Sequence, residues 1–434
     1  MKINIFWFRR DLRLEDNTAL NHALNADLPV LCAFIFDTNI TDELPGDDPR
    51  INFIYLTLSE INKTLQKAGS SIYILKGDPV EKWKELSVSF DINAVYLNRD
   101  YEPYAIQRDN SVKELLGRNG IKLLSFKDQV IFEADEIIKA DSSPYTIFTP
   151  YKNSWIKKLG ENPSYISLTE GVTHVNYFHN KYRFPSIKEI GFTKSSIEVR
   201  PYDLSVIPDY NKYHNFPAVD KTSYLSPHLR FGTVSIRKIV TIALNQNMSF
   251  LNELIWREFF MQILFHFPNV VTDSFRPVYE DIRWRNDENE FSRWCNGETG
   301  YPIVDAGMRQ LNATGYMHNR ARMITAGFLC KHLLIDWRWG EAYFANKLLD
   351  YELSSNNGNW QWAAGTGCDA APFFRIFNPE TQQKKFDPYQ EYIKRWVEDI
   401  NKPSYPEKIV EHEFARQRTL TVYRSGIRQR MKTI

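Results

Sequence analysis

Three side chains on one predicted helix could form a binding site. The segment FLNELIWREFFMQILFHF (250–267) has helical spacing, and Glu253, Trp256 and Arg257 follow one another at three and four residues, so they share one face. A carboxylate acceptor, an indole that stacks and a guanidinium that binds phosphate together suit a nucleotide-like ligand. An amphipathic helix with one Glu–Arg pair and a core Trp explains the same pattern, and the spacing leaves both interpretations open.

A second group of polar side chains occurs in GYMHNRARMITAGF (315–328). Asn319, Arg322 and Met323 fall on one helical face, whereas Arg320 projects elsewhere. An amide and guanidinium groups among apolar residues are costly to bury unless they are paired or face a ligand. The pattern favours a phosphate-rich or amide-rich ligand.

The segment DYELSSNNGNWQWAAGTGCDAAPFFRIFNP (350–379) combines carboxylates, amides and indoles. Asp350 and Glu352 are followed by two adjacent asparagines and then by Trp360 and Trp362. Because a helix turns by ~100° per residue, two Trp at this spacing point ~200° apart and serve different neighbours. The small residues that follow allow another group to approach the backbone closely. Together these features indicate a flat ligand.

Hydroxyl groups precede another predicted helix in TSYLSPHLRFG (222–232). Hydroxyls and backbone N–H groups in this position could hold a phosphate. Thr-Ser turns are also common helix caps, so both interpretations stay open.

The N-terminal part of the chain alternates apolar runs with segments of helical spacing. This rhythm predicts a doubly wound parallel sheet with right-handed crossovers. The predicted strands are 3–8, 30–36, 71–75, 94–97 and 122–125, and the predicted helices between them are 17–26, 50–68, 79–89 and 106–118. The turn after the first strand reads RRDLRLED rather than GxGxxG, so we do not expect a dinucleotide on a glycine-rich turn here.

The middle and C-terminal parts differ from this pattern. Between 135 and 199 several prolines interrupt the chain and periodicity is weak apart from 151–159, which indicates a long inter-domain linker. Beyond 200 the spacing is helical throughout. The predicted helices there are 235–245, 250–267, 288–296, 302–314, 319–328, 336–348 and 389–399. The expected organisation is therefore an α/β domain (1–134), a linker (135–199) and an all-α domain (200–434).

Composition excludes several classes of protein. The 434 residues suit two or three domains, and 43% hydrophobic and 25% charged residues exclude a disordered or fibrous chain. No apolar run reaches the ~18 residues of a membrane span, and the N-terminus lacks the apolar core of a secretory signal. The four cysteines show no CxxC spacing, so we expect no zinc site, no disulfide framework and a cytoplasmic location.

Charge and tryptophan are unevenly distributed. The net charge is −4 over 1–134, +1 over 135–199 and +4 over 200–434. This asymmetry is too mild for nucleic-acid binding by bulk charge, so any such site would be a local patch. Eight of the eleven Trp follow residue 200, so the helical part has either a Trp-rich core or a second use for indoles.

The chain resembles the DNA photolyase/cryptochrome family over nearly its whole length. The motifs that carry the resemblance are WFRRDLRLEDNTAL, TSYLSPHLRFG, NELIWREF, TGYPIVDAGMRQL, MHNRARMI and NNGNWQWAAGTGCDAAPFFRIFNP. The resemblance implies an N-terminal α/β antenna domain, a long linker and a helical domain that binds FAD and DNA. Within the family, the chain is most similar to class I cyclobutane pyrimidine dimer photolyases. NRARM favours repair of this dimer, because it places Met323 where relatives acting on (6-4) photoproducts have a histidine pattern.

Residue roles follow from the same resemblance. The FAD contacts that it implies are Tyr210, Thr222, Ser223, Tyr224, Leu225, Ser226, Arg257, Asn319, Arg322, Asp350, Glu352 and Asn356. The residues that it places at the DNA lesion are Glu253, Trp256, Asn319, Met323 and Trp362. The electron path to the flavin that it implies consists of Trp360, Trp337 and Trp284. The DNA contacts that it implies are Arg320, Arg375, Lys385 and His214, the last standing where related photolyases often have an arginine. Glu352 stands where many relatives have an aspartate.

The expected activity is light-dependent repair of pyrimidine dimers in ultraviolet-damaged DNA. We expect the protein to be a monomer and not to associate with a membrane. Asn98 and Glu102 resemble positions that contact an antenna pigment, for which methenyltetrahydrofolate is favoured over 8-hydroxydeazaflavin or an empty pocket. A cryptochrome-like photoreceptor, a (6-4) photoproduct photolyase and a helical nucleic-acid-binding protein without FAD are the alternatives.

Overall fold

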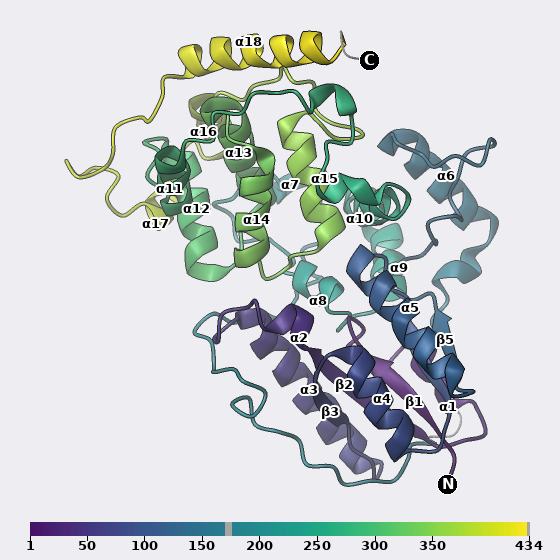
Figure 1. Cartoon of the computed structure of the whole chain (residues 1–434). Helices are drawn as coiled ribbons and strands as arrows, with labels where there is room; N and C mark the ends of the chain where they lie inside the picture. The colour runs from purple at the N-terminus through teal and green to yellow at the C-terminus, as the bar shows by residue number, and fades with distance from the viewer. Residues whose placement is uncertain (170–175, 432–434) are drawn as a thin grey trace. The chain divides into compact units, whose positions relative to one another are not determined.

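The computed structural model describes residues 1–169 and 176–431. Packing divides the chain into two units (Figure 1). The first unit comprises Met1–Ile137, Asn153–Tyr202 and Tyr224–Gln246, and the second comprises Ile138–Lys152, Asp203–Ser223 and Asn247–Ile434. Each unit has its own core.

The first unit is built on a five-stranded parallel sheet of order β3-β2-β1-β4-β5. The strands are β1 (Ile3–Phe8), β2 (Val30–Asp37), β3 (Tyr73–Gly77), β4 (Ile92–Asn98) and β5 (Lys122–Phe126). Its helices are α1 (Thr18–Leu24), α2 (Thr38–Thr41), α3 (Pro49–Lys67), α4 (Pro79–Ser89), α5 (Pro103–Arg118), α8 (Ser226–Arg230) and α9 (Ile236–Gln246).

Helices cover both faces of this sheet. Because strand side chains alternate, neighbouring residues of β1 belong to different cores. Phe6 lies in a core with Leu20 of α1 and Leu58 of α3. Trp7 lies in the other core and makes an edge contact with Trp83 of α4, with ring centroids 5.3 Å apart. The predicted doubly wound sheet is confirmed.

The second unit is helical, and none of its described residues forms a strand. Its helices are α7 (Tyr210–Tyr213), α10 (Met248–His266), α11 (Glu288–Asn296), α12 (Pro302–Thr314), α13 (Asn319–Gly327), α14 (Trp337–Lys347), α15 (Leu353–Ala364), α16 (Pro379–Phe386), α17 (Glu391–Trp396) and α18 (His412–Arg430). Three short segments join them: η2 (Pro268–Val271), η3 (Pro277–Tyr279) and the π-helical η4 (Phe328–Leu333). The predicted all-α domain is confirmed.

Several predicted elements differ in extent from the observed ones, and three of them are described here. The third strand begins at Tyr73 rather than 71, because Ser70 and Ser71 use their hydroxyls in loop hydrogen bonds before pairing with β2 starts. The predicted helix 319–328 ends as an α-helix at Gly327 and continues as π-helical turns. The predicted helix 389–399 is shortened to α17, because Gln390 adopts a left-handed backbone with φ of 57°.

The segment 135–199 is not devoid of structure. It contains α6 (Phe148–Glu161) and the short η1 (Pro163–Ile166), and Ile190 and Phe192 are buried in a core of the first unit. We keep the division at 134 and 199 as a proposal about domain organisation. No helix among the described residues is long and apolar enough to cross a membrane.

Two glycines allow helices of the second unit to pack closely. A Cβ at Gly340 of α14 would lie within 3.0 Å of the indole of Trp360 on α15. A Cβ at Gly358 of α15 would lie within 3.0 Å of the ring of Phe260 on α10. Helix α15 is therefore held against two neighbours at a distance that only glycine permits.

We expect Gly340→Ala to destabilise the second unit by about 1–3 kcal/mol, because the added methyl overpacks the contact with Trp360. Gly117 lies on the exposed side of α5 with no atom near its Cβ position. Gly117→Ala is therefore the control and should stabilise by roughly 0.5–1 kcal/mol. Urea unfolding measures both, and a neutral Gly340→Ala would contradict the packing argument.

Candidate functional site

Helix α15 is fixed at both ends. At its start, the carboxylate of Glu352 accepts hydrogen bonds from the backbone N–H of Ser355 at 3.0 Å and from the hydroxyl of Ser354 at 2.5 Å. At its end, the carbonyl of Ala364 accepts from Nζ of Lys331 at 2.5 Å and from the hydroxyl of Tyr423 at 2.8 Å. These contacts satisfy helix-end groups that would otherwise be unpaired, and they set the position of every side chain between them.

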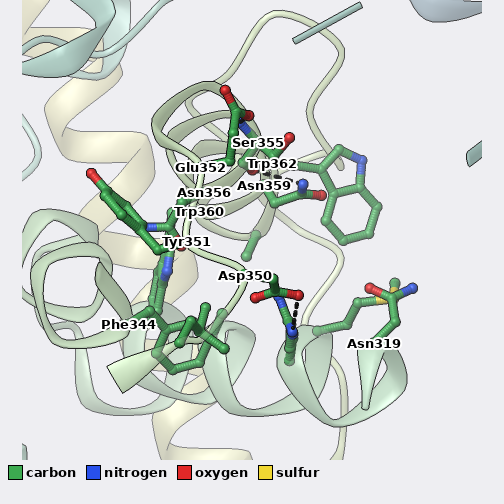
Figure 2. Close-up of a pocket in the computed structure, with 15 residues that line it drawn as sticks. Asn319, Phe344, Asp350, Tyr351, Glu352, Ser355, Asn356, Asn359, Trp360 and Trp362 are labelled. Atoms are coloured by element: carbon green, nitrogen blue, oxygen red, sulfur yellow. Dashed lines mark hydrogen bonds and ion pairs between the residues drawn. The ribbon is translucent and has the colours of Figure 1, made fainter. Parts of the chain in front are cut away.

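A cavity runs along α13, α14 and α15 (Figure 2). It is lined by Asn319, Arg322, Met323, Ala326, Phe344, Leu348, Asp350, Tyr351, Glu352, Ser355, Asn356, Asn359, Trp360, Trp362 and Ala363. An ion pair crosses its floor, where Nη2 of Arg322 lies 2.8 Å from Oδ2 of Asp350. The second oxygen of Asp350, Oδ1, is buried and has no hydrogen-bond partner among the described residues.

The asparagine at the centre of α15 is bonded to a buried acid. Nδ2 of Asn356 donates to Oε1 of Glu341 at 2.8 Å and to its backbone carbonyl at 3.1 Å. Burial raises the pKa of Glu341, while the hydrogen bond from Asn356 lowers it. This pair places a titratable carboxyl directly behind the cavity wall.

A second cavity adjoins the first. It is lined by Glu253, Trp256, Arg257, Phe260, Asn319, Met323, Ser355, Asn359 and Trp362. Five of these residues also line the first cavity: Asn319, Met323, Ser355, Asn359 and Trp362. The two cavities therefore share a wall, and one face of it carries Trp362.

The two indoles of α15 have different neighbours, as their spacing predicts. Trp360 is buried and packs against Phe344 and Trp294, with ring centroids 4.9 and 6.1 Å apart. Figure 2 shows Trp360 on the side of Phe344 and Trp362 on the side of Asn319. Trp360 lines only the first cavity, whereas Trp362 lines both.

The acid of the second cavity is held by a tyrosine. A side-chain hydrogen bond joins the hydroxyl of Tyr210 to the carboxyl of Glu253. Burial raises the pKa of Glu253, while the neighbouring His214 and the bond from Tyr210 lower it, burial being the larger effect. Glu253 is thus exposed to the cavity but placed where its protonated form is favoured.

The indole of Trp256 is already stacked. Phe148 lies parallel to it, with ring centroids 3.6 Å apart and planes 6° apart, and Phe260 lies 5.3 Å away at 28°. Phe148 comes from a segment about a hundred residues earlier, so nothing near Trp256 in the sequence could have predicted this contact. The stack orients the indole at the cavity wall.

Two family profiles match the chain. One, described as the FAD binding domain of DNA photolyase, matches residues 250–404, and one described as DNA photolyase matches residues 4–166. The deoxyribodipyrimidine photolyase of Synechococcus is 35% identical, and the alignment covers 96% of each chain. The chain belongs to the DNA photolyase family.

Solved photolyases share the whole fold. The bacterial class III photolyase of Agrobacterium tumefaciens is 32% identical with a TM-score of 0.87, and the match covers 98% of each chain. The archaeal photolyase of Sulfolobus tokodaii, whose structure contains two FAD molecules, is 34% identical with a TM-score of 0.85, covering 98% of this chain and 100% of that one. The FAD-binding domain of the photolyase family therefore coincides with the unit that contains both cavities.

The first cavity fits the FAD of a photolyase. Oδ1 of Asp350 is a buried acceptor without a partner, which a ligand N–H or O–H would satisfy. Asn319, Arg322 and Asn356, which the resemblance implies as FAD contacts, line the same cavity. Glu352 also lines it, but its carboxylate caps α15, so part of its hydrogen-bonding capacity is used within the protein.

The other predicted flavin contacts lie elsewhere. Arg257 lines the second cavity, and Tyr210 lies behind that cavity, bonded to Glu253. None of the five residues from Thr222 to Ser226 lines either cavity. Leu225 is buried, so only its backbone could contact a phosphate, and Tyr224 adopts a left-handed backbone with φ of 51°. The role of this turn stays a prediction.

The predicted electron-transfer residues lie in or against one apolar core. Trp337 and Trp360 are buried in it, and Trp284 packs against its edge. Trp294, which the sequence did not single out, is the tryptophan whose ring lies 6.1 Å from that of Trp360. The order in which these indoles exchange electrons stays a prediction.

The four predicted DNA contacts gather around Arg320. Its guanidinium carbon lies 4.2 Å from the ring centroid of Phe386, and Nζ of Lys385 lies 5.2 Å from the same centroid. Burial lowers the pKa of Arg320, and the charge of Arg375 lowers it further. Asn215 links His214 to Arg320 by hydrogen bonds.

A cavity in the first unit lies at the carboxyl ends of the strands. Glu102 lines it, together with Trp7, Asp37, Tyr104 and other residues of that edge. Asn98, the other tentative antenna residue, is buried and does not line the cavity. Its amide bonds to Asp11 and Asn17 and to the backbone N–H of Ala19. The structure therefore does not bring Asn98 and Glu102 together in one cavity.

The residue patterns did not identify one buried cation, although a single charge in the apolar run LCKHLLI (329–335) could have indicated it. Lys331 is 2% exposed, and its Nζ contacts the carbonyls of Ala364 and Phe373 and the ring face of Tyr423. It therefore joins the end of α15 to the segment that carries Arg375. Burial lowers the pKa of Lys331 to about 7.

The stability of the second unit should depend on pH through Lys331. A lysine in the unfolded chain titrates near a pKa of about 10.4, so between pH 7 and that value the unfolded chain holds a proton that the folded chain has released. The free energy of unfolding should therefore rise as pH increases through this interval, and Lys331→Met should remove that rise.

Urea unfolding at pH 7, 8 and 9 measures this difference. Lys347→Met is the control, because Lys347 is an exposed lysine of α14 and its removal should leave the wild-type pH dependence. Parallel profiles for the wild type and Lys331→Met would show that Lys331 stays protonated in the fold.

Proposed function

We propose that this chain is a light-dependent DNA repair enzyme that splits cyclobutane pyrimidine dimers. The observation that carries the proposal is the shared wall between the two cavities. A cavity that fits FAD adjoins one that contains a carboxyl, an indole and a methionine, so a flavin and a flipped-out pyrimidine dimer would lie next to each other. When bound, reduced FAD supplies the excited-state electron that opens the cyclobutane ring.

The residues of the second cavity bind and orient the lesion. Flipping a damaged dinucleotide out of the duplex costs a few kcal/mol, and least for a lesion that stacks poorly. Trp256 and Trp362 replace the lost stacking, at roughly 1–3 kcal/mol per base. Met323 fills the wall between them and the flavin cavity.

Glu253 lines the second cavity beside the proposed lesion site. Burial raises the pKa of its carboxyl, and in the protonated form this carboxyl would donate a hydrogen bond to a pyrimidine carbonyl and stabilise negative charge that develops there. Tyr210 fixes its orientation through the side-chain hydrogen bond. Asn319 lies on the wall between the two cavities, where its amide can contact either ligand.

The basic residues around Arg320 bind the DNA backbone. Arg375 and Lys385 are exposed, and together with Arg320 they form a local patch of positive charge in an otherwise balanced chain. For each phosphate contact, the logarithm of the binding constant should fall by about 0.9 for every tenfold increase in salt concentration.

Loss of dimers under blue light tests this function. Ultraviolet-damaged thymine-rich DNA is mixed with the reduced protein, with a dark control, and dimers are counted. We expect Glu253→Gln to lower the yield roughly tenfold, because it removes the acidic proton but keeps the shape. Flavin content should be unchanged.

Four outcomes would contradict the proposal or part of it. Repair of (6-4) photoproducts alone, or no light-dependent loss of either lesion, would favour the alternative repair activity or a photoreceptor. A colourless purified protein would favour a helical DNA-binding protein. Full yield from Glu253→Gln would remove the proposed role of that carboxyl.

We propose that Trp360, Trp337 and Trp284 conduct electrons to the flavin. Trp360→Phe should then reduce light-driven flavin reduction at least tenfold, while repair by chemically reduced protein persists. Trp396→Phe is the control, since Trp396 packs against the same core but lies outside the proposed path. Absorbance changes under illumination measure the rate, and an unchanged rate for Trp360→Phe would exclude this path.

Several finer assignments are proposals of the same kind. We propose class I from the resemblance of the motifs as a whole, and a higher similarity to aligned class III sequences would overturn this assignment. We propose that the cavity of the first unit holds an antenna pigment, and that this pigment is methenyltetrahydrofolate rather than 8-hydroxydeazaflavin. The absorbance spectrum of the pigment released when the protein unfolds would identify it.

We propose a cytoplasmic monomer, and four buried, unbridged cysteines suit a reducing compartment.

A further inference from the structure

Arg320 is a cation without a carboxylate partner among the described residues. Its Nη2 donates to Oδ1 of Asn215, and its Nε is buried with no acceptor in the described part of the chain. The guanidinium also lies against the ring of Phe386. A neutral amide is therefore the polar group that holds this charge in place.

Asn215 is held in turn by His214. Nδ2 of Asn215 lies 2.9 Å from Nε2 of His214, and Nδ1 of His214 lies 2.8 Å from the carbonyl of Tyr210. A carbonyl only accepts hydrogen bonds, so Nδ1 must carry the proton. Nε2 is then the acceptor for the amide N–H of Asn215, and the arrangement requires a neutral imidazole in its Nδ1–H form.

Protonation of His214 is incompatible with this arrangement. In the imidazolium both ring nitrogens donate, so Nε2–H would face the amide N–H group of Asn215. Rotating the amide brings Oδ1 to His214, but it then presents the N–H group to Arg320, which has only donors. The charged histidine and the hydrogen bond from Arg320 to Asn215 therefore exclude each other.

We propose that Asn215 and His214 are positioning residues that hold Arg320 away from a DNA phosphate, and that a proton on His214 releases it. This inference rests on the proposed function, because it takes the anion to be a phosphate of damaged DNA. Arg320 then exchanges a neutral acceptor for a charged one, which forms the stronger hydrogen bond.

The groups that face His214 come from three elements. Tyr210 stacks on its ring from α7, with centroids 4.7 Å apart. Glu253 of α10 and His318, the N-cap of α13, interact electrostatically with His214, and Arg320 of α13 is linked to it through Asn215. Burial lowers the pKa of His318 to about 4, with help from the neighbouring Arg320, Arg322 and His214, so His318 stays neutral above pH 5.

The affinity for a damaged oligonucleotide at fixed salt tests the proposal. Fluorescence anisotropy should show binding about tenfold tighter at pH 6 than at pH 8, because a histidine in water titrates near pH 6.5 and a hydrogen bond to a charged group is gained. Asn215→Ala removes the restraint, so its affinity at pH 8 should match that of the wild type at pH 6, with little remaining pH dependence. His266→Gln on α10 is the control and should keep the wild-type profile.

A simple charge effect predicts the opposite result. If His214 acted only by attracting DNA, Asn215→Ala and Arg320→Gln would both keep the full pH dependence, and that result would overturn the proposal. Thermal unfolding of Asn215→Ala at both pH values verifies that the variant is folded. His214→Gln, which cannot gain a proton, should bind equally at the two pH values.

The tautomer of His214 gives a readout that needs no DNA. Nitrogen NMR of labelled protein at pH 8 should show the Nδ1–H form of His214, and Asn215→Ala should release this preference. The Nε2–H form in the wild type would overturn the proposal. A protein that binds no damaged DNA at either pH would refute the proposed function, whereas the tautomer measurement would still decide whether the hydrogen-bonded arrangement exists.

Discussion

The close approach of α15 to α10 and α14 is the constraint on which the site depends. Gly340 and Gly358 leave no room for a side chain at these crossings, so the ring of Trp360 and the ring of Phe260 fill the space instead. Glu352 fixes one end of α15, and Lys331 and Tyr423 fix the other. With its axis and both ends fixed, the helix presents Trp360 to the core and Trp362 to the two cavities.

Some buried polar atoms of this unit have no partner among the described residues. A protein interior normally satisfies its buried donors and acceptors, and Oδ1 of Asp350 and Nε of Arg320 are among the exceptions. One lines the cavity that fits FAD, and the other lies in the basic patch assigned to DNA. A ligand that completed either atom would remove the energetic cost of leaving it unpaired, and this gain would add to the affinity for that ligand.

The sequence predicted the architecture well because its signals are local. The apolar runs and the helical spacing identify the sheet and most helices of the second unit, and the spacing of Trp360 and Trp362 correctly predicts two different neighbours. It missed contacts that depend on distant segments, such as Phe148 against Trp256 or Asn215 against Arg320. It also misplaced the start of β3, because the hydroxyls of Ser70 and Ser71 compete with strand pairing. The roles of individual residues came from the resemblance to the family. Geometry shows which side chains lie together but not what each of them does.

The stack of Phe148 on Trp256 has a consequence for recognition. With a phenyl ring parallel to it at 3.6 Å, the indole has little freedom to rotate before a guest arrives. An aromatic wall that is already ordered loses little conformational entropy on binding, so more of the stacking energy is available to compensate for the unstacking of the DNA. Phe260 also stacks on this indole, with ring centroids 5.3 Å apart, so a base bound there would use only the stacking area that the two phenyl rings leave.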